Sequence, residues 1–403
     1  MPCAICQKFD EMGTSGFVAT LCPILGYNRL SMRNCSISRP RVLIVNGSTT
    51  YLSKSLPRLF HQAGAWVVFA AKEGCSMLSS KYVDEGAVFN VEHPDAIDHL
   101  ERLVAQFNPA LLIVIDERLI EKILSQPEEI APRTRSHLPS GSHFSARAAF
   151  SRWAQSREIP MPESACCRQL DDALPLLSAW KEMFIKKNGS SGGVGVMHVT
   201  HAEELSDAWR MVEPGEEVLV QKALHGIIGI TDMMVNRGKL QAWVCSEKWR
   251  TVSTYGPSIA RRLFVPEGME DLVKKVASET GFHGLCGFDW VIDQEDGMPR
   301  LIEFHPRPPS GFGLGRWAGV DYVAAAASLI GTGKESYQAP DLKAFSRKSI
   351  CCYFPDHPSI SIRQGNWREL LNWLPGSRCR SWALLPWDDP KLLVRLVAGW
   401  LSH

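Results

Sequence analysis

The fold of this chain is most constrained by the stretch Met183-Phe-Ile-Lys-Lys-Asn-Gly-Ser-Ser-Gly-Gly-Val-Gly-Val196. A short apolar run leads into Lys186, and a loop with four glycines and two serines follows at once. Glycines let a backbone take positive φ angles and approach a phosphate closely, while backbone N–H groups and serine hydroxyls donate to its oxygens. The lysine adds a positive charge at the end of the strand. The stretch therefore predicts a strand followed by a phosphate-binding loop.

Two common phosphate-binding patterns do not fit this loop. A Walker A loop has its lysine after the glycines, whereas Lys186 and Lys187 come before them. A dinucleotide-binding fingerprint needs a third glycine, but Gly193 and Gly195 are followed at that position by His198. Taken alone, the stretch fits a flexible hairpin loop equally well, so a second signal has to decide between the two interpretations.

That second signal is a predicted β-hairpin with two carboxylates. Residues 287–293 and 301–305 read as strands, and an Asp-Gly turn lies between them. If the hairpin is centred on Asp296, Asp289 lies directly opposite Glu303 on the same face. Two like charges so placed need a cation, and Mg²⁺ prefers oxygen ligands. A register slip of one residue would turn one carboxylate to solvent instead, but the upstream loop favours a metal site.

Two further segments fit the same chemistry without deciding it. Arg307 follows the hairpin between two prolines, where a rigidly held guanidinium can bind a γ-phosphate or an acyl-phosphate oxyanion. By itself it reads equally as a surface arginine in a proline-rich turn. Residues 217–222 predict a strand whose end can present Gln221 to an adenine edge, and a plain core strand is an equally good interpretation.

The first part of the chain predicts a small doubly wound α/β domain. Apolar strands are expected at 41–47, 65–71 and 110–115, alternating with helices at 51–63 and 93–107. No GxGxxG pattern follows the first strand, which argues against a dinucleotide site there.

Composition narrows the class of protein. The 403 residues are 45% hydrophobic and 22% charged, as in ordinary globular proteins, and are enough for several domains. A net charge of +1 gives no reason to expect nucleic acid or a membrane as partner. The early apolar stretch, 17–25, is far shorter than the ~20 residues needed to cross a bilayer. The twelve cysteines include adjacent pairs and no complete zinc pattern, so reduced thiols and a cytoplasmic location are expected.

Taken in order, these segments resemble the ATP-grasp superfamily. The resemblance covers roughly 41–333. Within the superfamily, the chain is similar to the carbamoyl-phosphate-synthase-like and mycosporine-glycine-ligase-like branch. It implies mixed α/β and α+β architecture: an ATP-grasp fold with a preceding small doubly wound α/β domain. The expected divisions are an N-terminal extension (1–39), a pre-ATP-grasp domain (40–135), an ATP-grasp domain (136–335) and a C-terminal extension (336–403).

The resemblance also assigns roles to single positions. Arg147 stands where the family usually has a lysine, and Lys222 stands where an acid is usual; His305 replaces an asparagine. Asp232 is the nearest substitute for the family's ribose-binding acid. The implied catalytic residues are Arg307 and Lys186, and the implied metal ligands are Asp289, Glu303 and His305. The implied nucleotide-binding residues are Arg147, Lys186, Gly189, Ser190, Ser191, Gly192, Gly193, Gln221 and Lys222.

The implied reaction joins a carboxylate to an amine in small-molecule or peptide-like biosynthesis. ATP with Mg²⁺, or Mn²⁺, would phosphorylate a carboxylate, and an amine, such as that of an amino acid, would then displace phosphate. The loop 189–195 would close as a lid. An enol oxygen activated by a mycosporine-type ligase, a kinase-like phosphotransferase, and an ATP-binding sensor or scaffold without turnover are the alternatives. Small-molecule substrates are the expected partners, and a homodimer is left open. A solvated basic surface is expected for most of Lys248, Arg250, Arg261 and Arg262, and contact with an anionic substrate is the alternative.

Overall fold

The structure is a computed structural model that describes residues 39–47, 54–189, 192–335, 337–340, 350–374, 379 and 381–401. All the helices and strands below lie in the compact unit Pro40–His403. Residues 1–38 of the predicted N-terminal extension, and the predicted phosphate contacts Ser190 and Ser191, lie outside the described residues. The predicted boundaries at 135 and 335 stay predictions.

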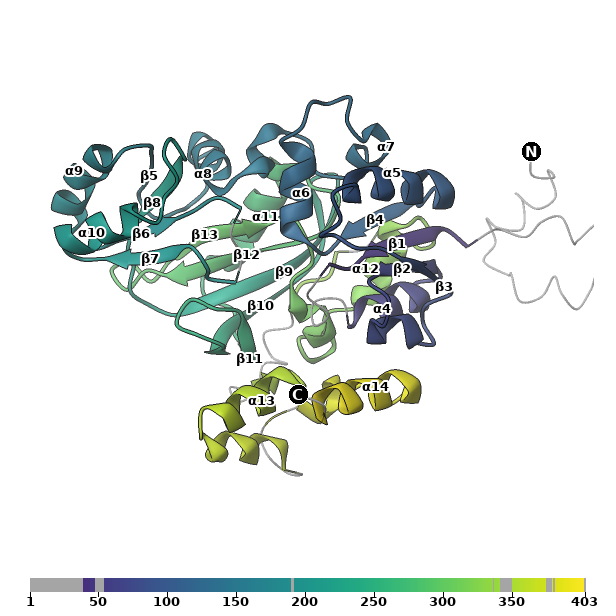
Figure 1. Cartoon of the computed structure of the whole chain (residues 1–403). Helices are drawn as coiled ribbons and strands as arrows, with labels where there is room; N and C mark the ends of the chain where they lie inside the picture. The colour runs from purple at the N-terminus through teal and green to yellow at the C-terminus, as the bar shows by residue number, and fades with distance from the viewer. Residues whose placement is uncertain are drawn as a thin grey trace, which may run out of the picture. The chain divides into compact units, whose positions relative to one another are not determined.

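The first part of the chain forms a parallel sheet in the order β3-β2-β1-β4 (Figure 1). Three of its strands are those predicted: β1 (Arg41–Val45), β2 (Trp66–Ala71) and β4 (Leu111–Val114). The sequence analysis missed β3 (Glu85–Val88), because this edge strand is largely exposed and carries no apolar run.

Helices cover both faces of this sheet, as in a doubly wound domain. The helices are α4 (Leu56–Gln62), α5 (Ala96–Phe107) and α6 (Glu117–Leu124). Side chains alternate along a strand, so Val42 and Ile44 share a hydrophobic cluster with α4, whereas Leu43 and Val45 share one with α5 and α6. The predicted α/β architecture of this region is confirmed.

A second, antiparallel sheet carries the glycine loop. Its order is β5-β8-β6-β7, made by β5 (Ser164–Cys167), β8 (Val218–Lys222), β6 (Met183–Lys186) and β7 (Val196–Val199). One face packs against α9 (Leu170–Trp180) and α10 (Ala202–Trp209). The loop joins β6 to β7, and the four glycines predicted to cradle phosphate all have positive φ.

The third sheet is antiparallel, in the order β13-β12-β9-β10-β11-β14. Its strands are β9 (Ile228–Asn236), β10 (Lys239–Thr251), β11 (Ser258–Leu263), β12 (Gly284–Ile292), β13 (Pro299–His305) and β14 (Ile350–Cys352). Helices α8 (Arg147–Ser156) and α11 (Met269–Thr280) pack with one face of this sheet. β14, which comes from the last part of the chain, pairs with β11 and forms the edge of the sheet.

Short helices make up most of the rest. The expected linker around 128–145 contains α7 (Pro132–Arg135) and the 3-10 helix η4 (Ser142–Ser145). The 3-10 helix η5 (Ser310–Trp317) and α12 (Tyr322–Leu329) follow β13. The other elements are η3 (Ser76–Ser79), α13 (Asp356–Arg363), η6 (Trp367–Trp373), η7 (Ser381–Leu384) and α14 (Pro390–Leu401). Among the described residues, none of the helices has the length and apolar character to cross a membrane.

The predicted hairpin forms with the predicted pairing, because a β-bulge corrects its register. Asp289 lies opposite Glu303, whereas Trp290 lies opposite Leu301, so Ile302 is an extra residue in β13. Phe288 and Trp290 belong to the hydrophobic cluster shared with α11. Alternation along the strand therefore turns Asp289 to the opposite face of the sheet, where a ligand can reach it.

Candidate functional site

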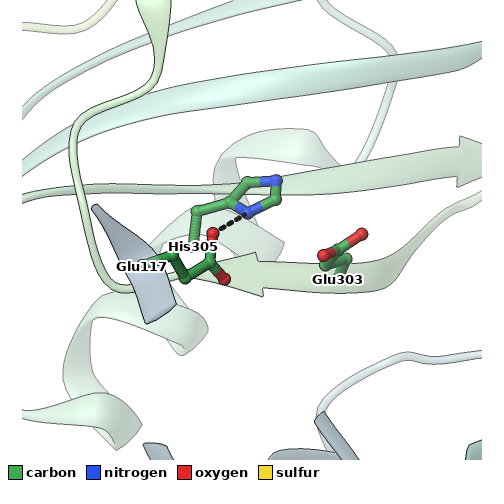
Figure 2. A group of neighbouring side chains, drawn as sticks. All are labelled: Glu117, Glu303 and His305. Carbon is green, nitrogen blue, oxygen red and sulfur yellow. Dashed lines mark ion pairs between the residues drawn. The ribbon is translucent and has the colours of Figure 1, made fainter. Parts of the chain in front are cut away.

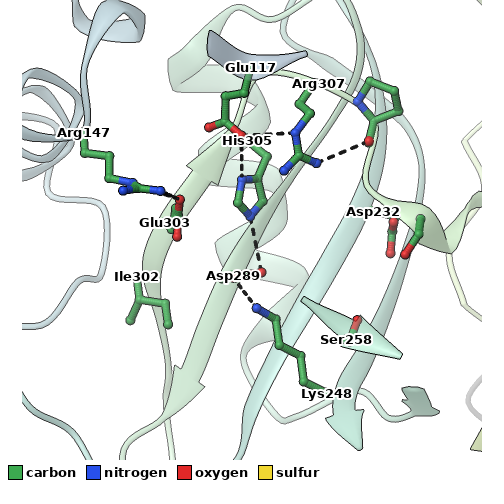
Figure 3. Close-up of polar contacts among 12 residues, drawn as sticks. Glu117, Arg147, Asp232, Lys248, Ser258, Asp289, Ile302, Glu303, His305 and Arg307 are labelled. Carbon is green, nitrogen blue, oxygen red and sulfur yellow. Dashed lines mark hydrogen bonds and ion pairs between the residues drawn. The ribbon is translucent and has the colours of Figure 1, made fainter. Parts of the chain in front are cut away.

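The two opposed carboxylates are each paired with a basic side chain (Figure 3). Asp289 binds the ammonium group of Lys248, which comes from β10. Arg147, the first residue of α8, donates to Glu303 Oε1 from Nε at 3.0 Å and from Nη2 at 2.6 Å. Both acids are largely buried, with 9% and 19% of their side chains exposed. The two acids therefore stabilise positive charge beside them.

A third acid joins the site from the parallel sheet. Glu117 is the first residue of α6, directly beyond the carboxyl end of β4. Its Oε2 lies 3.5 Å from His305 Nδ1 and accepts a hydrogen bond of 3.1 Å from Arg307 Nε. On the other side, His305 Nε2 lies 3.4 Å from Asp289 Oδ1. Figure 3 shows the resulting row of alternating charges, from Arg307 through Glu117, His305 and Asp289 to Lys248.

Lys186 is a buried cation at the end of β6. Its Nζ donates to Gln221 Oε1 at 2.7 Å and to the backbone oxygen of Ile302 at 3.3 Å. Only 6% of the residue is exposed. Burial lowers the pKa of Lys186 to about 8, against the opposing effect of Glu303. Lys186 is therefore a positive charge held at the backbone of the carboxylate hairpin, and its predicted role toward a phosphate stays a prediction.

Charge pairing sets the protonation of the other groups. Burial raises the pKa of Glu117, but Arg307 and His305 outweigh it and lower the value to about 2. Burial likewise opposes ionisation of Asp289, yet Lys248 and His305 hold its pKa below the ordinary value. For His305, burial lowers the pKa, but Asp289 and Glu117 raise it to about 9. At neutral pH the site therefore holds ionised acids around an imidazolium.

A group of three potential metal ligands overlaps the predicted set in Glu303 and His305. Glu117, Glu303 and His305 each offer a ligand atom, and these atoms lie within 4.8 Å of one another (Figure 2). Asp289, which was predicted with Glu303 and His305, is held by Lys248 and His305 instead. Its Oδ1 is nevertheless buried without a hydrogen bond from the described residues. Carboxylate oxygens of this kind suit Mg²⁺.

The glycine loop reaches the same site. Gly192 and Gly193 line a cavity together with Asp289, Glu303 and His305. Gly193 has a φ of +83°, and a Cβ there would lie 2.3 Å from the backbone oxygen of Tyr255. Only glycine fits this close approach. The described part of the loop thus lies against the turn between β10 and β11, over the carboxylates.

Two residues on β8 predicted to bind nucleotide have protein partners in this structure. Gln221 is buried; its Oε1 accepts from Lys186, and its Nε2 donates to Ser164 at 3.1 Å. Lys222 lies at the end of the strand, where its Nζ binds Glu163 at 2.6 Å. The role of Gln221 and Lys222 toward an adenine stays a prediction.

Asp232 is not available to a ribose, because it is fully buried. It accepts from Arg261 Nη1 at 2.8 Å and from the Gly311 backbone N–H at 2.7 Å. Most of the basic residues Lys248, Arg250, Arg261 and Arg262 were expected on a solvated surface, and this expectation is wrong for Lys248 and Arg261. Lys248 is bound to Asp289, and Arg261 is 2% exposed.

Glu117 was missed, although two acids directly after a buried parallel strand are a recognisable signal at a sheet edge.

The similarity of this chain to known proteins lies in the fold and not in the sequence. No family model matches the chain. No curated protein matches it either. One solved structure with a similar fold is the biotin carboxylase domain of 2-oxoglutarate carboxylase from Hydrogenobacter thermophilus, in complex with MgADP, ADP and bicarbonate. It is 16% identical, with a TM-score of 0.58 over 77% of this chain and 73% of that chain.

Two other enzymes share the same architecture. N5-carboxyaminoimidazole synthetase from Staphylococcus aureus, complexed with ADP, is 14% identical, with a TM-score of 0.57 over 75% of this chain and 80% of that chain. The L-amino acid ligase from Bacillus licheniformis is 14% identical, with a TM-score of 0.53 over 73% of this chain and 75% of that chain. At such low identity the likeness establishes the arrangement of the three sheets and nothing finer.

Proposed function

From the ATP-grasp fold of this chain, we propose that it is a Mg-ATP-dependent ligase that joins a carboxylate to an amine. The observation that carries the proposal is the convergence of Lys186, the glycine loop and the opposed pair Asp289 and Glu303 on one site. ADP in similar structures, including MgADP in one, supports the same nucleotide and metal here.

The residues of the hairpin fit a magnesium ion bound with nucleotide. Asp289 and Glu303 supply carboxylate oxygens, and Mg²⁺ usually completes its coordination with water and substrate phosphates. The metal would neutralise charge on the phosphates during phosphoryl transfer. In the same state, Arg147 and Lys248 would turn from the carboxylates to the phosphate oxygens. Asp289 and Glu117 raise the pKa of His305, so binding of a metal by His305 would have to displace its proton.

The proposed reaction has two steps, phosphoryl transfer to the acid and acyl transfer to the amine. A carboxylate oxygen attacks the γ-phosphorus of ATP, the bond from that phosphorus to the bridging oxygen breaks, and ADP leaves. The amine nitrogen then attacks the acyl carbon, phosphate leaves with the bonding electrons, and the nitrogen loses a proton. Arg307 would stabilise the developing oxyanion. Closure of the loop 189–195 would keep water from the acyl phosphate.

ADP release distinguishes this reaction from its alternatives. The full chain would be incubated with MgATP and a matrix of carboxylic acids and amines, and ADP and product mass would be measured. A ligase forms ADP over many turnovers only when both acid and amine are present, because the amine must clear the acyl phosphate formed in the first step, and Asp289→Asn should abolish this turnover. Phosphorylated acid that accumulates without amine to many times the amount of enzyme would establish the kinase-like alternative. Tight MgATP binding with no ADP from any pair would establish a sensor or scaffold and refute the proposal.

A further inference from the structure

A second cavity lies next to the candidate active site. Its volume of about 480 Å³ is within the range of ~300–1,000 Å³ found for small-molecule sites. Three separate parts of the chain form its walls: α4, the segment from η5 into α12, and the C-terminal segment that includes η7 and α14. None of the residues predicted to bind nucleotide or metal lines it.

The walls of this cavity are mostly apolar. Leu59 comes from α4, Phe312 and Tyr322 from the middle segment, and Leu384 and Leu396 from the C-terminal segment. The rings of Phe312 and Tyr322 meet edge to face, with centroids 4.9 Å apart, which fixes the shape of the wall. Such a surface favours an apolar ligand body, because burial of apolar area provides most of the binding free energy.

The charged side chains at the cavity are mainly basic. Lys54, Arg58 and Arg316 line it, and Asp321 is the only acid among its described lining residues. The Asp321 carboxylate accepts hydrogen bonds from the N–H groups at the start of α12, at 2.9 and 3.0 Å. Lys54 Nζ donates to the Phe354 backbone oxygen at 2.5 Å, and burial lowers the pKa of Lys54. Arg58 pairs with Asp388 at 3.2 Å, and the Arg316 guanidinium lies 4.4 Å from the centroid of the Trp317 ring. Even so, three basic side chains against one acid in the lining favour an anion over an ammonium ion.

Ser310 connects this cavity to the active-site cavity, because it lines both. Arg261, which lines the active-site cavity with Arg307, donates from Nη2 to Ser310 Oγ at 2.9 Å. On the other side, the Tyr353 hydroxyl lies near Ser310. The buried Tyr353 oxygen makes no hydrogen bond of normal geometry with the described residues. A polar ligand group at this junction would give Tyr353 a partner.

We infer that the second cavity binds the apolar body of the acid substrate, with the carboxylate directed past Ser310 toward Arg307. This assignment rests on the ligase function proposed above and adds a substrate class: carboxylic acids with an aryl or branched alkyl body. The amine substrate binds elsewhere, because the basic side chains repel an ammonium group. The C-terminal segment contributes one wall, so it determines which acids fit.

Calorimetry with the full chain tests the assignment without requiring turnover. In the presence of MgADP, 4-phenylbutanoate is expected to bind at least tenfold more tightly than either acetate or 4-phenylbutylamine. Leu385 is a partly buried lining residue outside the main core, so Leu385→Trp should narrow the cavity. This variant is expected to weaken 4-phenylbutanoate binding at least tenfold and to leave MgADP affinity unchanged. Leu371→Trp, at a residue 58% exposed and away from the cavity, is the matched control and should bind like the native chain.

Charge reversal provides a second variant that does not disturb the core. Arg316 is exposed, so Arg316→Glu should fold, weaken binding of the acid and spare MgADP, whereas Arg316→Lys should retain binding. Equal affinity for acetate and 4-phenylbutanoate, no binding of 4-phenylbutanoate, or normal binding by both Leu385→Trp and Arg316→Glu would overturn the inference. If the acid binds as expected but no acid and amine pair yields ADP, the site stands and the ligase function fails.

Discussion

Arg307 Nε donates to Glu117 Oε2 at 3.1 Å, although the two residues are 190 positions apart in the sequence. Arg307 follows the last strand of the carboxylate hairpin, and Glu117 begins the helix that follows β4 of the parallel sheet. The guanidinium proposed to stabilise the oxyanion is therefore oriented by a residue of the first α/β region. This arrangement makes the first region a structural part of the site.

Glu117→Gln is expected to slow ADP formation about ten- to a hundredfold. The variant removes the negative charge that holds both Arg307 and His305, and hydrogen bonds to charged groups contribute ~1.5–3 kcal/mol. Steady-state kinetics with the acid and amine pair found by screening would measure the loss. Glu128→Gln, at an exposed position, is the control. Unchanged kcat in Glu117→Gln would show that Arg307 does not depend on this contact.

Arg261→Met is expected to lower the free energy of unfolding by about 3–5 kcal/mol, because it leaves the buried Asp232 carboxylate unpaired. Urea denaturation measures the change. The double variant Asp232→Asn/Arg261→Met should be destabilised by less than the sum of the two single changes. Lys274→Met, which breaks the exposed pair with Glu270, should cost less than ~1 kcal/mol. Equal losses at the buried and the exposed pair would contradict this expectation.

Gly193→Ala is expected to weaken MgADP binding at least tenfold, measured by calorimetry. Its Cβ would meet the Tyr255 backbone oxygen at 2.3 Å, so the loop could not lie over the carboxylates. Gly189→Ala separates this clash from backbone strain. Gly189 also has a positive φ, of +62°, but a Cβ there has no neighbour within 4 Å. If both variants lose affinity equally, strain alone explains the loss and the contact with Tyr255 has no role.

The free energy of unfolding is expected to fall as pH rises from about 5 to 7, because Glu121 loses a proton that its folded environment favours. Burial and the nearby Glu117 raise the pKa of Glu121 to about 7, from 4.5. The folded state therefore keeps a proton that the unfolded state releases, and the free energy of unfolding falls by up to about 3 kcal/mol over this range. Urea unfolding at several pH values should show a smaller fall in Glu121→Gln than in the native chain. Parallel pH profiles would mean that Glu121 is ionised throughout.

The sequence pattern predicted the hairpin and the pairing of Asp289 with Glu303, but it did not predict the bulge on which this pairing depends. The turn placed Asp289 opposite Glu303, and the structure agrees only because Ile302 forms a bulge. Without the bulge the register near the turn would put Ile302 opposite Asp289. Bulges depend on cross-strand packing, for which a single strand gives no periodic signal.

Most contacts between distant segments were not predicted from the sequence. The predicted strands of the parallel sheet formed, but the edge strand β3 and the position of Glu117 were missed. Lys248 and Arg261 were expected on the surface because charged residues usually lie there. Each is instead paired with one carboxylate from another strand: the half-buried Lys248 with Asp289, and the buried Arg261 with Asp232. Such pairings depend on how the sheets meet.

The edge position of β14 has a consequence for synthesis of the chain. The sheet that carries Asp289 and Glu303 gains its sixth strand only from Ile350–Cys352, and Leu392 and Leu396 of α14 share a cluster with Val42 and Ile44 of β1. A ribosome releases these residues late, after the hairpin and both other sheets have emerged. The glycine-loop sheet, whose hydrophobic cluster ends at Val220, can therefore form earlier, whereas one face of the parallel sheet is completed only when α14 has emerged. The third sheet can be completed only after Ile350–Cys352 have emerged from the ribosome.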